Sequence, residues 1–266
     1  MGLPMSRRLC SAGYKVSAWN RTSCKTDSLA KLGATVYDQP AGAVEGADIV
    51  VSMLESGPVV EYVLFNQGVA KAMKLGALFI DMASIKPREA RDHAARLGAL
   101  GIAHLDAPVS GGVVGAEEGK LVIMAGGKAT DFERARPVFA HFGRATHVGP
   151  HGCGQLAKLA NQMIVGITIG AVAEALLFTQ RGGADMAKVK EAITGGFADS
   201  HILQVHGQRM VERDFAPRAR MSIQLKDMRN VLATADEIGF TAPVTALFEK
   251  LYAKSIKHGL PVRSVL

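Results

Sequence analysis

Short apolar runs alternate with segments of helical periodicity over the first 150 residues of the chain. The runs IVVSML and ALFIDM are nearly continuous, which is typical of parallel strands covered by helices on both faces. The apolar runs predict strands at residues 15–19, 48–54, 77–82, 103–109 and 121–125. The periodic segments predict helices at residues 4–12, 25–32, 58–74, 87–100 and 130–142. This alternation indicates a doubly wound α/β domain with a parallel sheet.

The predicted order of elements starts with a helix. Residues 4–12 place Met5, Leu9 and Cys10 on one face, and a strand follows directly at residues 15–19. A helix that leads through a glycine turn into a strand is the second half of a βαβ unit. We therefore expect the first strand of the sheet to lie before Met1, outside this sequence.

The pattern changes after the breaker Gly149-Pro150-His151-Gly152, and almost everything that follows is helical. We expect a nucleotide-binding α/β domain at residues 1–149 and an all-helical domain at residues 150–266. The most apolar segment, residues 163–179, is shorter than the roughly 20 apolar residues of a membrane span. We expect it to be a helix buried on all sides, and we expect no contact with a membrane.

Composition narrows the classes of partner. The formal charge is +7, but the basic residues are scattered and only 6% of the residues are aromatic, which argues against nucleic-acid binding. Such a charge favours small anionic ligands. Cys10, Cys24 and Cys153 lack the spacing of a zinc site or a disulfide framework, so we expect a cytoplasmic protein without a metal site.

Gly2 and the segment Asn20-Arg21-Thr22 are candidate contacts for the adenosine end of a dinucleotide. If Gly2 is the last glycine of a G-x-G-x-x-G motif, the strand at residues 15–19 is the second of the fold, and its tip meets the adenosine ribose. An arginine, an amide and a hydroxyl there suit a 2′-phosphate and favour NADP over NAD. A surface arginine in a polar loop is an equally good interpretation of these residues alone.

Ser110, Gly111 and Gly112 end a predicted strand at the sheet edge where α/β proteins bind ligands. Two consecutive glycines allow backbone N–H groups to converge on one point, and the serine hydroxyl adds a donor. This combination suits a carboxylate. An ordinary glycine-rich turn is the alternative.

A polar stripe marks the start of the first helix after the breaker. Gln155, Lys158, Asn161 and Gln162 follow the spacing i, i+3, i+6, i+7, so they share one face of an otherwise apolar helix. Polar groups on a buried helix need partners or a cleft, so we expect a cleft between the domains. A lysine there suits carbonyl reduction, in which Lys158 donates a proton to the oxygen.

The motifs Asp106-Ala-Pro-Val-Ser-Gly-Gly112 and Gly152-Cys-Gly-Gln-Leu-Ala-Lys158 resemble the substrate-binding and catalytic-lysine motifs of the β-hydroxyacid dehydrogenase family. The likeness covers nearly the whole chain and implies a Rossmann-type domain with Lys158 as the catalytic acid/base. It also implies substrate contacts at Ser110, Gly111 and Gly112. Many members have a substrate-contacting asparagine where this chain has Gln162. The pair Asn161-Gln162 is similar to that of the tartronate semialdehyde reductases.

The resemblance implies further cofactor contacts at Leu54, Glu55, Ser84 and Lys226, and it favours NADP, with NAD as the other option. The expected activity is interconversion of a small 3-hydroxy acid and its semialdehyde, with tartronate semialdehyde and glycerate as the favoured pair. 3-Hydroxyisobutyrate and glyoxylate or succinic semialdehyde stay open as substrates. So does a non-catalytic binding protein on the same fold. The helical domain suggests a homo-oligomer, either a dimer or a tetramer.

Overall fold

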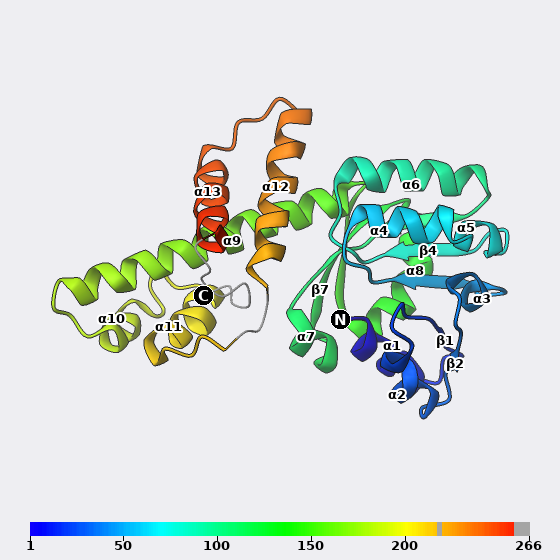
Figure 1. The fold of residues 1–266 in the computed structure, drawn as a ribbon, viewed down its shortest axis with the longest axis horizontal. Coiled ribbons are helices and arrows are strands. Elements are labelled where there is room, and N and C mark those ends of the chain that lie inside the picture. The colour runs from blue at the N-terminus through cyan, green and yellow to red at the C-terminus, as the bar shows by residue number, and fades with distance from the viewer. Residues whose placement is uncertain (217–219, 258–266) are drawn as a thin grey trace. The chain divides into compact units, whose positions relative to one another are not determined.

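A computed structural model describes residues 1–216 and 220–257 (Figure 1). The chain divides into two compact units, residues 1–158 and residues 159–266. The first unit is α/β, and the described part of the second contains only helices, so the predicted fold class is confirmed. The expected boundary at Gly149 falls at the turn before helix α9 (Cys153–Arg181), which carries the chain from one unit into the other.

The main sheet of the first unit has the strand order β3-β4-β5-β7-β6, with β8 paired to β7. Strands β3 (Ile49–Ser52), β4 (Leu78–Asp81) and β5 (Ala103–Asp106) are parallel, as the apolar runs predict. Strand β7 (Leu121–Gly127) is antiparallel to β5 and to β6 (Val109–Ser110), and parallel to β8 (Gly143–Gly149). Antiparallel strands at the margin of a parallel sheet are common in such folds.

A second, two-stranded sheet stands apart from the first. Helix α1 (Gly2–Ser11) leads into β1 (Ser17–Ala18), which pairs in parallel with β2 (Thr35–Val36). Among the residues that the structure describes, β3 pairs only with β4, so its other edge is open. The two sheets are therefore separate in the described structure.

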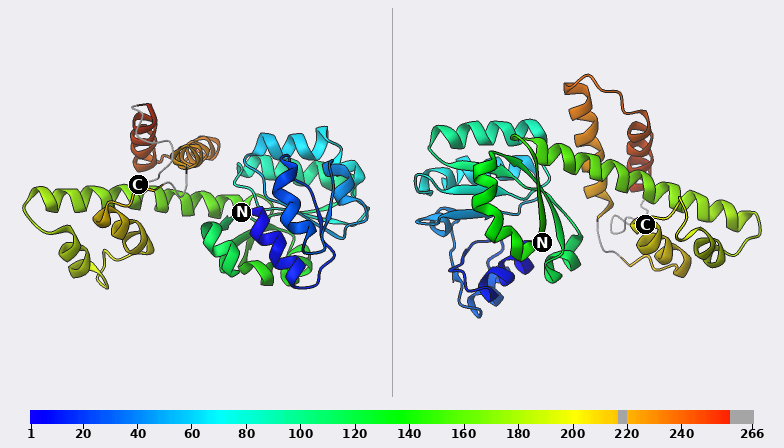
Figure 2. Two further views of the ribbon diagram at one scale, coloured as in Figure 1. Left: turned by 60° about the horizontal axis from the view of Figure 1, so that its bottom comes forward. Right: turned by 180° about the vertical axis from the view of Figure 1, so that it is seen from behind.

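Helices cover both faces of the main sheet (Figure 1, Figure 2). On one face, α1 and α8 (Ala129–Phe142) bury Met5, Phe139 and Phe142 against the strands. The opposite core contains residues of α4 (Gly57–Glu61), α5 (Val69–Ala72) and α6 (Pro87–Ala99). This three-layer arrangement explains why the strand sequences are apolar without alternation.

Several short elements differ from the predictions. The helix expected at residues 58–74 is interrupted, because Gly68 has a φ of 76° and separates a π-helical turn (Tyr62–Asn66) from α5. The helix expected at residues 25–32 consists of a 3₁₀ turn (Ser23–Thr26) and α2 (Asp27–Ala30). The unpredicted elements are β2, β6, β8, α3 (Pro40–Val44) and α7 (Gly112–Glu118).

The second unit packs around the apolar part of α9. Its other helices are α10 (Met186–Ile193), α11 (Gln208–Glu212), α12 (Met221–Glu237) and α13 (Pro243–Lys257), with a π-helical turn at Leu203–Gly207. The core joins Ile169, Leu176, Leu225 and Met228. The Tyr252 hydroxyl of α13 donates a 2.8 Å hydrogen bond to the Gly166 carbonyl of α9. Gly170 lets α13 approach α9 closely, because a Cβ atom there would overlap the Phe248 ring.

Helix α9 is buried along one stripe only, so the prediction of a helix buried on all sides is wrong. Ile169, Val172 and Leu176 face the core, whereas Ile164 is 67% exposed and Phe178 is 76% exposed. By length and composition α9 could also cross a membrane, although core helices of other proteins meet the same criterion. Packing in the core of the second unit therefore does not explain why the exposed face of α9 is apolar.

Candidate active site

Three parallel strands of the first unit end at one level. Ser52 pairs with Asp81, and Asp81 pairs with Asp106, so β3, β4 and β5 finish in register at their carboxyl ends. Most of the predicted site residues of this unit follow these ends, with Leu54 and Glu55 after β3, Ser84 after β4, and Ser110, Gly111 and Gly112 after β5. The topology thus collects several predicted cofactor and substrate contacts along one sheet edge, where α/β folds bind their ligands.

Gly2 joins this edge from the first helix. A Cβ atom placed on Gly2 would lie 3.6 Å from the Met53 Cβ, so the start of α1 is beside the residue that follows β3. Helix α1 thereby begins next to the Leu54 segment, as its proposed part in a phosphate-binding turn requires.

The segment Ser110-Gly111-Gly112 forms a turn whose backbone conformation favours glycine at two consecutive positions. Gly111 has a φ of 128° and Gly112 a φ of 64°, conformations that residues with a Cβ atom rarely adopt. Both glycines are exposed, and Ser110 is half-buried at the end of β6. The turn therefore presents its backbone to solvent at the carboxyl edge of the sheet, and such a turn can receive a carboxylate.

Asp106 anchors the first turn of α9. Its carboxylate accepts hydrogen bonds from the backbone N–H groups of Gly152 at 2.8 Å and Gln155 at 2.9 Å. Asp106 is fully buried, with a relative exposure of 0%. The sequence analysis named Asp106 only as the first residue of a motif. No local sequence pattern indicates that it caps a helix that begins more than forty residues further along the chain.

Gln155 ties the same turn to the loop that carries Ser84. Its Oε1 accepts a 3.0 Å hydrogen bond from the Ile85 N–H, and its Nε2 donates a 2.9 Å hydrogen bond to the Ala83 carbonyl. The carboxamide thus holds the residues on both sides of Ser84, and Gln155 is itself fully buried. Buried hydrogen bonds thus join the ends of two strands, β4 and β5, to the start of α9.

Lys158 lies one helical turn beyond Gln155 and is the last residue of the first unit. It is only 8% exposed, which is rare for a lysine because burying an ammonium group is costly. An i, i+3 spacing places it on the same face of α9 as Gln155. A buried lysine above the carboxyl edge of a sheet is suited to moving a proton.

The second unit holds another part of the predicted site in one polar network. The Asn161 Nδ2 donates to the Gln162 Oε1 at 2.9 Å, and the Gln162 Nε2 donates to the Asp227 Oδ2 at 2.6 Å. The Lys226 ammonium lies 3.3 Å from the other oxygen of Asp227. Asp227 is 1% exposed and was not among the predicted residues, since a Lys-Asp sequence is ordinary on a helix.

Asn20, Arg21 and Thr22 are not part of the main sheet edge. They follow β1 in the two-stranded sheet, where the Asn20 Oδ1 accepts a 2.9 Å hydrogen bond from the Thr22 N–H. This turn leaves Arg21 exposed, with its guanidinium available to a ligand. The geometry is compatible with recognition of a phosphate at the tip of the strand.

Two buried polar atoms at the main edge lack a partner within the described chain. They are the Ser52 Oγ and the Asp81 Oδ2, which belong to paired positions of β3 and β4. Buried polar atoms are normally hydrogen-bonded, so unpaired ones call for an explanation such as a ligand or water. Their place at the ends of parallel strands fits a polar ligand such as a dinucleotide.

Burial raises the pKa of the Asp81 carboxyl to about 7, and the neighbouring Asp106 adds to this rise. The folded state therefore loses stability as pH rises from the unfolded pKa near 3.8 through 7.

We expect Asp81→Asn to raise the free energy of unfolding at pH 8 by about 2 to 4 kcal/mol, since one pKa unit corresponds to about 1.4 kcal/mol. Urea unfolding at pH 8 and at pH 3.5 checks this, with the exposed Asp236→Asn as control. A gain equal at both pH values would contradict it.

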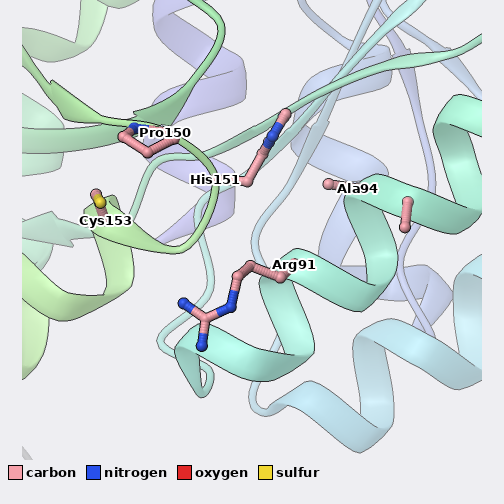
Figure 3. A pocket seen from close by; sticks show the side chains of 6 residues that line it. Arg91, Ala94, Pro150, His151 and Cys153 are labelled. Carbon is pink, nitrogen blue, oxygen red and sulfur yellow. The ribbon is translucent and has the colours of Figure 1, made fainter. Parts of the chain in front are cut away.

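A hollow of about 540 Å³ lies behind the start of α9 (Figure 3). Arg91 and Ala94 of α6 line one side, and Pro150, His151 and Cys153 line the other. The His151 Nε2 is hydrogen-bonded to the His104 carbonyl at 2.9 Å. None of the predicted site residues lines this hollow, so the strand ends, and not the hollow, form the candidate site of the first unit.

Comparison with known proteins gives matches over almost the entire chain. The family model for the NAD binding domain of 6-phosphogluconate dehydrogenase matches residues 1–152. The model for the NAD-binding domain of NADP-dependent 3-hydroxyisobutyrate dehydrogenase matches residues 152–263. The chain therefore contains domains of the type that binds NAD or NADP.

Individual relatives agree with these matches. The 2-hydroxy-3-oxopropionate reductase of Escherichia coli K12 is 41% identical over 97% of this chain and 89% of its own length. A 3-hydroxyisobutyrate dehydrogenase of Pseudomonas aeruginosa is 34% identical over 95% of this chain and 88% of its own length. The structure of Mycobacterium tuberculosis 3-hydroxyisobutyrate dehydrogenase with L-serine has a TM-score of 0.89 and 32% identity, covering 97% of this chain and 91% of that chain.

Proposed function

The chain belongs to the β-hydroxyacid dehydrogenase family, whose members are NAD(P)-dependent, and we propose that it reduces tartronate semialdehyde to glycerate with NADPH. The observation that carries this proposal is the buried Lys158 on α9, one turn before the amide pair Asn161 and Gln162. A lysine supplies the proton for carbonyl reduction, and the amides supply polar contacts for a hydroxylated substrate.

Lys158 acts as the general acid. When bound, NADPH supplies a hydride to the carbonyl carbon of the substrate. As the C=O π bond breaks, negative charge develops on the oxygen, and the Lys158 ammonium stabilises this charge and donates a proton to it. A new C–H bond and a new O–H bond result. In the reverse direction, the uncharged amine of Lys158 accepts the hydroxyl proton.

Substrate orientation comes from two further groups. The backbone N–H groups of Gly111 and Gly112, with the Ser110 hydroxyl, receive the substrate carboxylate. The Asp227 carboxylate accepts a hydrogen bond from the Gln162 Nε2, so the other end of that carboxamide, Oε1, faces Asn161. Because a carboxylate only accepts hydrogen bonds, Asp227 fixes the orientation of both side-chain amides. The 41% identity to a 2-hydroxy-3-oxopropionate reductase supports a substrate that carries a 2-hydroxyl group.

The cofactor is held mainly by the sheet edge. Gly2, Leu54, Glu55 and Ser84 lie along or beside the ends of β3 and β4, and the unpaired Ser52 hydroxyl fits a polar ligand there. We also propose Lys226 as a cofactor contact, which the likeness to the family implies; its ammonium lies 3.3 Å from Asp227. Asn20, Arg21 and Thr22 bind the 2′-phosphate of NADP, and this assignment distinguishes NADPH from NADH.

Arg21 provides the most direct test of cofactor preference. We expect Arg21→Ala to weaken NADPH binding by about 10- to 100-fold, because hydrogen bonds between charged groups contribute about 1.5–3 kcal/mol. Binding of NADH should change by less than about threefold, since that cofactor lacks the phosphate. Quenching of Trp19, the only tryptophan, reports both affinities. Lys31→Ala, which removes an exposed lysine at the end of α2, is the control, and equal weakening of both cofactors would contradict the assignment.

Substrate choice is tested by comparing three aldehydes at saturating NADPH. We expect kcat/KM to be highest for tartronate semialdehyde and lower for methylmalonate semialdehyde and succinic semialdehyde. The loss of NADPH absorbance measures each reduction rate. A preference for methylmalonate semialdehyde would assign the chain to the 3-hydroxyisobutyrate branch. NADPH binding without turnover of any of the three would favour a non-catalytic binding protein.

The second unit also supports assembly with another copy of the chain. Val244, Leu247 and Leu251 form an i, i+3, i+7 stripe on α13 and are 51%, 55% and 47% exposed. An apolar stripe of this kind on a helix normally packs against a partner. We expect Leu247→Glu with Leu251→Glu to convert an oligomer into monomers in sedimentation velocity, and Lys250→Glu to leave the mass unchanged. A wild-type chain that sediments as a monomer would contradict this assembly.

A further inference from the structure

The buried carboxamide of Gln155 links the loop of Ser84 to the helix of Lys158. Ser84 is half-buried at the end of β4, between the two residues whose backbone groups Gln155 binds. The distances are 3.0 Å from the Ile85 nitrogen to Oε1 and 2.9 Å from Nε2 to the Ala83 oxygen. One side chain therefore satisfies a donor and an acceptor on either side of a proposed cofactor contact.

Asp106 fixes the backbone position of Gln155. Its backbone N–H donates to the Asp106 carboxylate at 2.9 Å, and the Gly152 N–H donates to the other oxygen at 2.8 Å. Asp106 belongs to the segment that continues into the nest at Ser110. Gln155 and Asp106 are both 0% exposed, so water does not compete for these hydrogen bonds.

We propose that Gln155 is a positioning residue that sets the place of Lys158 relative to the Ser84 loop, and this inference rests on the proposed function of Lys158. Lys158 is one turn from Gln155 on the same helix face, so a shift of the first turn of α9 moves the ammonium group. Proton donation to a carbonyl oxygen requires hydrogen-bond distance in the reacting complex. A displacement of about 1 Å at such a site costs about 10²-fold in rate.

Gln155→Met removes both hydrogen bonds while keeping the length of the side chain. We expect kcat to fall by about 10²-fold, with KM for the semialdehyde within about threefold, because the carboxylate nest is not altered. The primary deuterium isotope effect on kcat, with NADPH labelled at the transferred hydrogen, should rise as the chemical step becomes slower. Gln180→Met, an exposed change on the same helix, should leave all three quantities unchanged.

Gln155→Glu adds a readout that depends on protonation. A neutral carboxylic acid can accept from Ile85 and donate to Ala83, whereas a carboxylate places an oxygen against the Ala83 carbonyl. We expect the ratio of variant to wild-type kcat to increase as pH falls. Gln155→Met should show no such recovery.

Hydrogen exchange of the Ile85 amide tests the link without turnover. We expect exchange in the wild-type chain to be slow and to accelerate at least tenfold in Gln155→Met, with Gln180→Met unchanged. The inference is overturned if Gln155→Met keeps kcat within about threefold of wild type. It is also overturned if the fall in kcat equals the fraction of the variant that is unfolded and the isotope effect is unchanged. Failure of the proposed function is recognised separately: either the wild-type chain then does not reduce the semialdehyde or Lys158→Met retains its rate, whereas exchange of the Ile85 amide still reports the link.

Discussion

Replacing Lys158 with methionine is expected to lower kcat for semialdehyde reduction by about 10²- to 10⁴-fold, the range over which general acid catalysis contributes. Lys158 is 8% exposed, so a methionine of similar length occupies the same buried space without the cost of a buried charge. NADPH binding should remain within a fewfold of the wild-type affinity. Steady-state reduction of tartronate semialdehyde and quenching of Trp19 measure the two effects.

The control for this change is Lys188→Met, which removes an exposed lysine from α10 and should leave kcat unaltered. The pH profile gives a second criterion. If Lys158 is the proton donor, the limb of the profile that reports its ionisation disappears in Lys158→Met. A variant that retains both the wild-type kcat and the wild-type pH profile would remove Lys158 from the mechanism.

Gly154→Ala is expected to destabilise the first unit strongly. A Cβ atom at this position would overlap the Asp106 carbonyl oxygen and would lie 2.5 Å from the Met124 oxygen and 2.8 Å from the Gly126 nitrogen. All three are backbone atoms of the sheet, so no side chain can move aside. We expect a loss of more than about 4 kcal/mol in the free energy of unfolding, which exceeds the usual effect of a point mutation.

Chemical denaturation followed by circular dichroism measures this loss. The matched control is Gly98→Ala in α6, where a Cβ atom meets nothing within 4 Å. That change should stabilise the chain slightly, because alanine has a higher helix propensity than glycine. A similar effect of both substitutions would show that the close approach of α9 to the sheet is not rigid.

The main elements of the first unit are predictable because their sequence patterns reflect local burial. Strands β3 and β4 lie between helices on both faces of the sheet and therefore appear as nearly continuous apolar runs. Strand β8 was missed because it alternates half-buried and exposed residues from Gly143 to Gly149, so it contains no apolar run. Helix α7 was missed because its start coincides with the two glycines of the nest.

The site is predictable only in part, for a similar reason. Lys158 and Ser110 belong to compact motifs, whereas Asp106 and Asp227 act through partners far away in the sequence. The role of these two aspartates depends on which distant segments the fold brings together, and a single sequence does not show which segments are in contact. The exposed face of α9 is a related case, since an apolar pattern shows that a surface avoids water and does not show what covers it.

Transfer of a labelled hydride tests the central claim most directly. The chain is incubated with NADPH deuterated at the transferred position of C4 and with tartronate semialdehyde, and the product is examined by NMR. We predict glycerate with one deuterium at C3 in stoichiometric amount with the NADPH oxidised, and no labelled glycerate from Lys158→Met in the same time. A folded wild-type chain that binds NADPH but yields no labelled glycerate would contradict the proposed function.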